Sequence, residues 1–368
     1  MNSPSFYPTA RPPLFVFRII ANRAGLPAGL LAEFGSGNGS ADAVAVALAL
    51  ADAVSLGQAF PCFYRDGGAG DPTGAVDGAM VLAQAALGQA ALGQAALGQA
   101  AAGQVPVGLD GWAAMAPGAL WLADDKLAGQ NLPEDVQWIA GEWCMAPPPR
   151  PSGTQAASRV LALQLVQLVM DDADTHEIEA LLRRDPTLSY QLLRLVNSLG
   201  MGVVRRISSF SQALMILGRQ QLRRWLNLML FAARQGDPRS PMLLARVAVR
   251  ARALELLARA RGMDKLMQEQ AFMTGMFSLL GVLFGMALPA LLAPLSISEA
   301  VQGALLRREG ELGALLRLVE TAEHADFGTI AVQLEALQLG AGEFNATMVE
   351  ATRWMLGAMR ETEGMAHA

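Results

Sequence analysis

The sequence predicts an α/β region followed by an all-α region, and two observations carry that prediction. In the first 149 residues, short apolar runs typical of strands alternate with an Ala- and Val-rich helical stretch. Later in the chain, capped segments have apolar residues at steps of three and four, which is typical of packed helices. A length of 368 residues suits about two domains. We therefore expect an α/β domain over 1–149, a Pro-rich linker over 150–154 and a helical domain over 155–368.

Composition and the start of the chain indicate a cytoplasmic globular protein. Hydrophobic residues make up 52% and charged residues 17%, a balance typical of compact domains. The opening residues lack the basic and apolar segments of a signal sequence. Cys62 and Cys144 fit no metal-ligand spacing and are expected to be reduced thiols. The apolar run 271–292 predicts a buried core helix ending near Pro289 rather than a membrane span.

The elements expected in the first half are short. One helix is predicted over 41–56, where Ala and Val dominate. The predicted strands are 14–20, 59–64, 105–112, 119–124 and 138–147. Between them, 85–104 repeats Ala-Leu-Gly-Gln-Ala every five residues, a period that matches neither a helix nor a strand. We interpret that tract as a repeat insertion and assign it no activity.

The most informative stretch begins at Asp185. Its carboxylate can accept hydrogen bonds from a first helical turn, and Pro186 lacks an N–H where none is needed. Leu188, Leu192 and Leu195 then recur at helical spacing and predict a buried stripe. A capping pattern at Ser209 starts a second helix, in which Leu217 is expected to be buried.

These helices resemble the HDOD domain, a signalling module related to HD-GYP phosphodiesterases but without their metal site. The residues of the signature are Asp185, Pro186, Leu188, Ser189, Leu192, Arg194, Asn197 and Ser198. The resemblance continues through 272–280 and 305–310, and it extends across about 155–360. It implies a bundle of about ten helices. Arg194 and Asn197 either fix helix packing or present a binding surface.

The resemblance also locates the positions at which HD-type hydrolases bind metal. An adjacent His-Asp pair would stand at Ser278 and Leu279, and neither residue can serve as such a ligand. The three histidines, His176, His324 and His367, are dispersed, and the first two are expected on helix surfaces. The resemblance therefore implies no catalytic residue, metal or cofactor in the helical half.

HDOD proteins of the same subgroup carry an EAL domain in front, and the first half resembles a shortened, degenerate one. EAL domains are barrel-like phosphodiesterases for cyclic di-GMP that hold metal ions with carboxylates. Their glutamate aligns with Gly29, and their paired aspartates align with Asp110 and Gly111, so ligands are missing. A full barrel takes about 250 residues. The resemblance thus implies an incomplete barrel without catalysis.

Charge is distributed unevenly along the chain. Residues 150–265 contain 18 Lys/Arg against 9 Asp/Glu, whereas 1–149 and 266–368 each contain 5 against 12. This pattern allows a nucleic-acid surface or, as we favour, solvated helix faces that pair with the acidic segments. The arginines of the first interpretation are Arg219, Arg223, Arg224, Arg246, Arg250 and Arg252.

Three functions follow as hypotheses. The first is a non-catalytic signalling scaffold that binds an unidentified protein partner in a bacterial pathway related to cyclic di-GMP. The second is a residual cyclic di-GMP phosphodiesterase, and the third is a nucleic-acid binder that uses residues 150–265. Self-association stays open. Because an incomplete barrel would expose apolar surface, we also expect the two halves to pack together.

Overall fold

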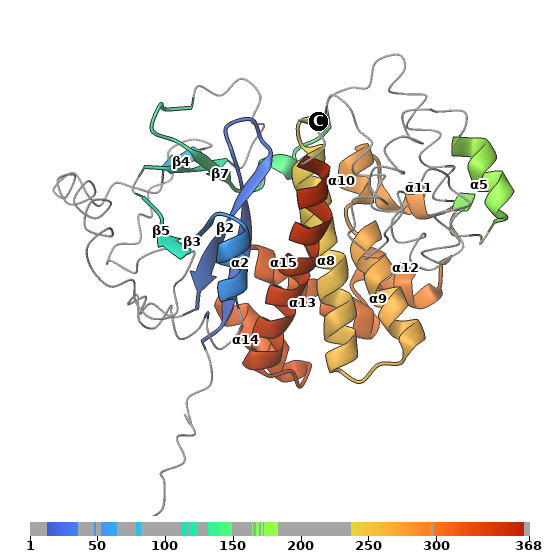
Figure 1. Cartoon of the computed structure of the whole chain (residues 1–368). Coiled ribbons are helices and arrows are strands. Elements are labelled where there is room, and N and C mark those ends of the chain that lie inside the picture. Colours follow the sequence, from blue (N-terminus) through green and yellow to red (C-terminus); the bar gives the residue numbers. More distant parts are fainter. Residues whose placement is uncertain are drawn as a thin grey trace, which may run out of the picture.

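A β-sheet and a helical bundle lie side by side in this chain, as the computed structural model shows (Figure 1). The residues that the structure describes are 13–35, 48, 53–64, 79–81, 112–116, 118–123, 132–148, 164, 167–168, 171, 173–182, 237–293, 295 and 297–363. The described strands all precede residue 141. The prediction of a strand-rich first part and a helical second part is therefore confirmed.

The described elements follow one another in chain order. The strands are β1 (Phe15–Ala21), β2 (Pro27–Phe34), β3 (Cys62–Tyr64), β4 (Ala79–Val81), β5 (Trp112–Ala114), β6 (Leu120–Ala123) and β7 (Trp138–Ala140). A 3₁₀ turn, η1 (Trp143–Met145), follows β7. The helices are α2 (Val54–Ala59), α5 (Thr175–Leu182), α8 (Ser240–Ala260), α9 (Lys265–Phe277), α10 (Leu280–Phe284), α11 (Leu288–Leu292), α12 (Glu299–Arg307), α13 (Gly310–Glu323), α14 (Phe327–Ala336) and α15 (Ala341–Glu363).

The described strands form one sheet in the order β4-β6-β7-β1-β2-β3-β5. β1 is antiparallel to β2 and β7, whereas β2, β3 and β5 are mutually parallel, as are β6 and β7. The β1–β2 hairpin turns at Asn22, whose side-chain oxygen accepts hydrogen bonds from the N–H groups of Ala24 and Leu26. Gly25 has a φ of 78°, which glycine adopts without strain.

Two predicted strands are present near their expected limits, and two described strands, β2 and β4, were missed. The runs 14–20 and 119–124 correspond to β1 and β6, so those predictions are confirmed. β2 was not predicted, although it is one of the two longest described strands. Its residues are almost all buried, so the alternation that marks a half-exposed strand is absent.

Other predicted limits were wrong. The run 59–64 begins as helix, because the N–H of Phe60 still bonds the carbonyl of Leu56, and β3 starts only at Cys62. The run 138–147 leaves the sheet after Ala140, since Gly141 takes a φ of 104° and η1 follows.

Some predictions concern segments that the structure describes only in part or not at all. Of the helix 41–56, Leu48 is helical and α2 starts at residue 54. Of the strand 105–112, only its last residue is described, and it begins β5. The repeat 85–104 lies outside the described residues.

The bundle is centred on α8 and α9, which cross closely. Asp264 caps α9, because its side chain accepts a hydrogen bond of 2.8 Å from the N–H of Met267. At Gly275 the helices are so near that an added Cβ would lie 2.4 Å from the Cα of Ala251. A glycine at this position permits the close packing.

The predicted single helix across 271–292 is wrong, because three helices replace it. Ser278 turns the chain at the end of α9, where its hydroxyl donates to the carbonyl of Gly275 at 2.7 Å. Gly285 ends α10 with a φ of 61°, and Pro289 lies in the first turn of α11. The burial of the apolar residues in this run was predicted correctly, as Leu283 and Phe284 are at most 1% exposed.

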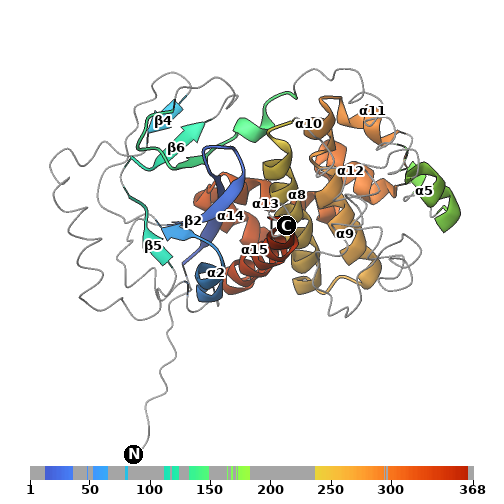
Figure 2. The same cartoon turned by 45° about the horizontal axis from the view of Figure 1, so that its top comes forward.

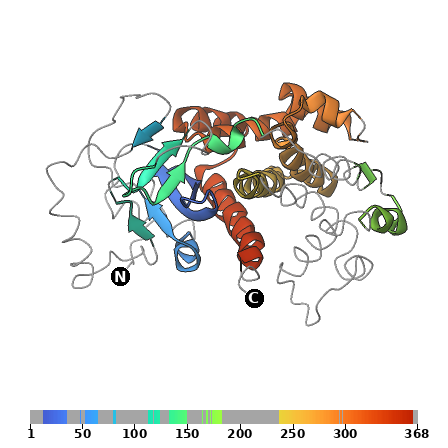
Figure 3. The same ribbon diagram turned by 90° about the horizontal axis from the view of Figure 1, so that it is seen from above.

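The bundle covers the sheet along β1, which contacts α8, α13 and α15. Seen from above, α8 and α15 lie between the sheet and α9 (Figure 3). Buried residues from both regions, such as Phe15 of the sheet and Phe344 of α15, belong to one hydrophobic core. A smaller, separate cluster within the sheet consists of Ile20, Leu31, Leu120 and Ala140.

Hydrogen bonds between distant parts of the sequence reinforce this contact. Asn345 of α15 accepts a bond from the N–H of Phe15 at 3.3 Å and donates one to the carbonyl of Pro13 at 2.8 Å. Alongside, α2 lies next to α15 (Figure 2), where Arg353 donates to the hydroxyl of Ser55 at 2.7 Å. The expectation that the two halves pack together is therefore confirmed.

The helices that the structure describes can be compared with the length of a bilayer-spanning helix. None of them combines the length and the apolar surface that crossing a bilayer requires.

Candidate functional site

Charged side chains gather where α8, α13 and the segment after β7 meet. We call these residues the arginine–glutamate cluster: Glu142, Arg246, Arg250, Ser278, Arg308, Glu320 and Glu323. The two arginines of α8 are four residues apart, and the two glutamates of α13 are three apart, so each pair lies on one helix face. Packing of α8 on α13 brings the two faces together.

Arg250 is the most buried cation of the arginine–glutamate cluster, with a side chain 4% exposed. Its guanidinium binds both carboxylate oxygens of Glu323 at 2.7 Å each. One terminal nitrogen also donates to the hydroxyl of Ser278 at 2.8 Å and lies 3.5 Å from Glu320. This two-pronged geometry is the strong form of an Arg–carboxylate contact.

Arg246 connects the bundle to the sheet. Its Nε donates to Glu323 at 2.6 Å, and its two terminal nitrogens bind the carboxylate of Glu142 at 2.8 and 3.0 Å. Glu142 lies just after β7, so this contact joins residues about 100 positions apart in the sequence. Glu323 therefore bridges both arginines of α8.

Arg308 completes the arginine–glutamate cluster on the side of α12. It follows that helix with a φ of 58° and binds both oxygens of Glu320 at 2.8 and 2.9 Å. A non-glycine residue in this conformation is strained, and the ion pair helps to hold it. The cluster thus contains three arginines and three glutamates, and its formal charges balance.

The ionisation of the arginine–glutamate cluster follows from its partners. Burial alone would raise the pKa of Glu323, but attraction first to Arg246 and then to Arg250 lowers it to about 2. Burial would lower the pKa of Arg246, but Glu323 and Glu142 raise it instead. The carboxylate and the guanidinium therefore both stay charged at neutral pH.

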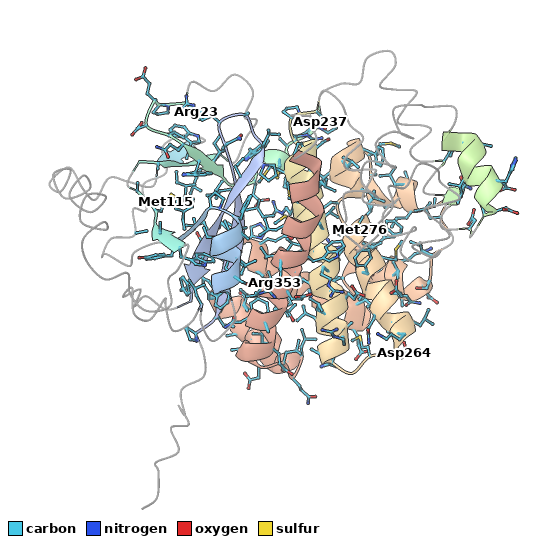
Figure 4. All side chains as sticks on the ribbon, in the orientation of Figure 1. Arg23, Met115, Asp237, Asp264, Met276 and Arg353 are labelled. Carbon is cyan, nitrogen blue, oxygen red and sulfur yellow. The ribbon has the colours of Figure 1, made fainter. Side chains whose placement is uncertain are left out.

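A second contact between the halves lies nearby, at the start of α8. Asp237, labelled in Figure 4, binds the guanidinium of Arg239 at 2.8 and 3.0 Å. Arg239 also donates to the backbone carbonyls of Ala146 and, at 3.5 Å, Cys144. The segment after β7 is thus held to α8 at two places.

A cavity of about 60 Å³ opens beside the arginine–glutamate cluster, between β1 and the bundle. Its walls include apolar side chains of both halves, among them Phe17 and Met348. The charged groups at its edge already have partners, since Arg18 binds Glu33 at 2.9 Å and Arg246 binds two glutamates. At about 10–15 Å³ for each water, the cavity has room for a small group of water molecules.

The predicted HD positions lie at this site. The Ser278 hydroxyl donates to the carbonyl of Gly275 and accepts from Arg250. Leu279 is 1% exposed and belongs to the hydrophobic core. The structure thus brings one of the two positions, Ser278, into the arginine–glutamate cluster. The guanidinium of Arg250 lies beside its hydroxyl, in the space that a metal ion would need.

Of the predicted EAL positions, the described part of the chain includes only Gly29. It lies inside β2. An added Cβ would approach the side chain of Ile20 and the carbonyl of Pro61 to 3.1 Å, which leaves little space for a larger residue. Asp110 and Gly111 are not among the described residues.

The HDOD signature falls outside the described residues as well. All eight signature positions between 185 and 198 lie there, as does Leu217, which was predicted to be buried. The histidine predictions are confirmed at the two described positions, because His176 and His324 are both exposed. His367 lies outside the described residues.

The described half of the predicted nucleic-acid surface is engaged inside the protein. Arg246 and Arg250 belong to the arginine–glutamate cluster. Arg252 pairs with Glu255 at 2.8 Å and with Glu350 at 3.3 Å. These three arginines are 4–20% exposed, and each binds carboxylates within the protein. The pairing with acidic segments, which we favoured, is confirmed for them.

The glutamates of the arginine–glutamate cluster were missed by the sequence reasoning. A signal existed in α8, because two arginines four residues apart interrupt an apolar helix and require partners when buried. Their partners could not be assigned, since Glu142 and Glu323 lie far away along the sequence.

The described residues offer neither a metal site nor a reactive thiol. Among the described residues, no three His, Cys, Asp or Glu side chains gather as metal ligands. Both cysteines are free and buried. Burial raises the pKa of Cys62 to about 12, and burial also raises that of Cys144, although Arg246 opposes the shift. Neither thiol is therefore an activated nucleophile.

Comparison with known proteins gives the family of the helical region. A protein of Vibrio cholerae named cyclic di-GMP phosphodiesterase CdgJ is 36% identical over 199 residues, which are 53% of this chain and 45% of that protein. Protein YuxH of Bacillus subtilis, named as uncharacterized, is 28% identical over 193 residues, 52% of this chain and 46% of that one. The chain thus spans about half the length of the relatives it matches.

A solved structure of a Shewanella amazonensis protein covers 57% of this chain and 98% of its own, with 14% identity and a TM-score of 0.40. The HDOD domain family model matches residues 156–333, which include α8 to α13 and the signature region. Residues 156–333 of this chain are therefore an HDOD domain.

Proposed function

We propose that this chain is a non-catalytic signalling scaffold whose HDOD domain docks another protein. In this proposal the first half is a degenerate EAL-like domain. It has lost its catalytic activity and packs against the bundle. The pathway is a bacterial regulatory one related to cyclic di-GMP.

The state of Ser278 is the observation that carries the proposal. Metal-dependent hydrolysis requires a metal ion with open coordination positions. At Ser278 the hydroxyl is already engaged on both sides, and the space beside it holds the guanidinium of Arg250. Leu279, the second expected ligand position, is in the core. This arrangement supports an HDOD domain that acts by binding rather than by hydrolysis.

Two features of the sheet support an EAL-like origin for the first half. The parallel groups β2-β3-β5 and β6-β7 are what part of a β/α barrel would retain. Gly29 offers no carboxylate where an EAL domain has its glutamate. The name of the Vibrio cholerae relative, a cyclic di-GMP phosphodiesterase, supports the assignment to that pathway.

A hydrolysis assay tests the loss of catalysis. The full chain is incubated with cyclic di-GMP and Mg²⁺ or Mn²⁺, and linear product is measured by chromatography. We expect no turnover above that of buffer, because the aligned ligand positions lack carboxylates. Turnover that Asp110→Asn abolishes would contradict the proposal.

Such turnover would instead establish the second candidate, a residual cyclic di-GMP phosphodiesterase. The name of the Vibrio cholerae relative favours this candidate. Calorimetric titration of the full chain with cyclic di-GMP and Ca²⁺ separates binding without hydrolysis from no binding at all.

A partner experiment tests the docking role. The full chain and its Arg194→Ala and Asn197→Ala variants are used as bait in extracts of the source cell, with the exposed Arg317→Ala as a matched control. We expect one protein to be recovered by the wild type and by the control, and to be lost with a signature variant of unchanged melting temperature. Equal recovery by all four baits would contradict docking through the signature residues. Light scattering of the bait alone measures self-association.

A further inference from the structure

Arg250 is a desolvated cation whose partners come from other parts of the bundle. Two carboxylates of α13 and the hydroxyl at the end of α9 converge on its guanidinium. Oxygen atoms that converge from separate helices are the arrangement with which proteins bind hard metal ions. Here the positive charge belongs to the chain itself.

We propose that Arg250 is a built-in cation, which holds Glu320, Glu323 and Ser278 together as a bound metal ion would. This role makes Arg250 a positioning residue of the HDOD domain. It deepens the proposed function, because it states what replaced a metal at the Ser278 position, but its test does not depend on a partner or on hydrolysis.

Charge balance supports the inference. With Arg250 present, the arginine–glutamate cluster contains as many arginines as glutamates. Without it, Arg246 and Arg308 still pair with Glu323 and Glu320, yet one negative charge remains uncompensated in a largely buried place. An uncompensated buried carboxylate is unfavourable, so the vacated space becomes a site for a small cation.

The role of Arg250 extends to the contact between the two halves. Arg250 orients Glu323 through two bonds, and the same carboxylate accepts from Arg246. Arg246 in turn binds Glu142 beside the sheet. Loss of Arg250 is therefore transmitted to the segment 138–148, about 100 residues away along the chain.

Chemical rescue tests the inference in the full chain. The variant Arg250→Ala removes the guanidinium, and Arg252→Ala, in the same helix but outside the arginine–glutamate cluster, is the matched control. We expect a melting temperature about 5–10 °C lower for Arg250→Ala. Millimolar methylguanidinium should restore part of this loss in Arg250→Ala and none in the control. Hydrogen exchange should become faster in 138–148 for Arg250→Ala only.

A metal arm of the experiment excludes the opposite assignment. The wild type should melt at the same temperature with EDTA and with Mn²⁺, whereas Mn²⁺ should raise that of Arg250→Ala. If EDTA destabilises the wild type and Mn²⁺ restores it, a metal holds the site and the proposal is wrong. Arg250→Ala that melts like the control, or that responds to neither cation, would also overturn it.

The variant Arg250→Lys keeps the test decisive if Arg250→Ala does not fold. It retains the charge and loses the two-pronged contact, so its melting temperature should lie below that of the wild type. Mn²⁺ should leave it unchanged, because the positive charge is still present. A rise with Mn²⁺ in Arg250→Lys would contradict the built-in cation.

Discussion

The helical bundle and the sheet differ in how far each is stabilised by its own contacts. The bundle has long helices that pack on one another, as α8 does on α9 and α15. The sheet has β1 and β2 as its long strands, and its other described strands are three or four residues long. Most of its buried residues join the core of the bundle, and only a small cluster is its own. The sheet therefore depends on the bundle more than the bundle depends on the sheet.

Charged groups show the same asymmetry. Buried arginines of the bundle form ion pairs with glutamates of the bundle, as Arg250 does with Glu323. The segment after β7 contributes Glu142, and it binds Arg246 of α8 and Arg239, which directly precedes α8. The sheet is therefore held to the bundle by arginines that also have carboxylate partners within the bundle.

The largest effect is expected when the two halves are separated. Residues 1–149 and 152–368 are expressed as two fragments. We expect the second to be soluble and to melt cooperatively, and the first to be poorly soluble, because Phe15 and Trp143 lose the helices that bury them. Solubility and thermal melting are measured. A soluble, cooperatively folding first fragment without affinity for the second would show that the sheet is self-sufficient.

The next largest effect is expected from Glu323→Ala. It leaves the guanidinium groups of Arg246 and Arg250 without their shared carboxylate, and breaking a buried ion pair costs about 3–5 kcal/mol. The control is Glu311→Ala, also in α13, because that side chain is 59% exposed and pairs with Arg261. The control should change the free energy of unfolding by less than about 1 kcal/mol. Urea unfolding measures both, and equal effects would contradict the prediction.

The low pKa of the Glu323 carboxylate predicts that the stability of the protein depends on pH. The pKa of Glu323 is about 2 in the folded protein against an ordinary value of 4.5, so the folded state binds fewer protons than the unfolded state between these values. Its contribution to stability is therefore complete above pH 4.5 and is lost as the pH falls toward 2. The difference in unfolding free energy between the wild type and Glu323→Gln should be constant near neutrality and should shrink below about pH 4.5. A difference that grows on acidification would contradict it.

Gly275→Ala tests the close packing that distinguishes the bundle. The new methyl group would lie 2.4 Å from Ala251, so α8 and α9 must separate at a cost of about 1–3 kcal/mol. The matched control is Gly357→Ala in α15, where nothing lies within 4 Å. That variant should gain about 0.5–1 kcal/mol from better helix propensity. Thermal melts of the two should shift in opposite directions, and shifts of the same sign would refute the packing argument.

The smallest and most local effect is expected from Asn345→Ala. It removes the bonds to Phe15 and Pro13 and should cost about 1 kcal/mol. Hydrogen exchange should become faster in β1 while α9 keeps its protection, because only the sheet loses contacts. Faster exchange in both regions would mean that the bundle depends on the sheet after all.

Local patterns in the sequence predicted part of the fold and the family of the helical half. Apolar runs located β1 and β6, and composition separated a strand-rich half from a helical half. The signature around Asp185 indicated the HDOD domain, which the family match over 156–333 confirms. These features depend on neighbours along the chain, so the sequence contains them directly.

Other features depend on packing between distant segments, and only the tertiary structure decided them. Most residues of β2 are buried, and Leu31 packs in a cluster with the distant Leu120 and Ala140, so the alternation that would have revealed the strand is absent. The break of 271–292 into three helices follows from a hydroxyl contact and a left-handed glycine within an otherwise helical pattern. The partners of Arg250 and Arg246 come from α9, α13 and the segment after β7. Their choice follows from which helix faces meet, and no residue spacing along the chain encodes it.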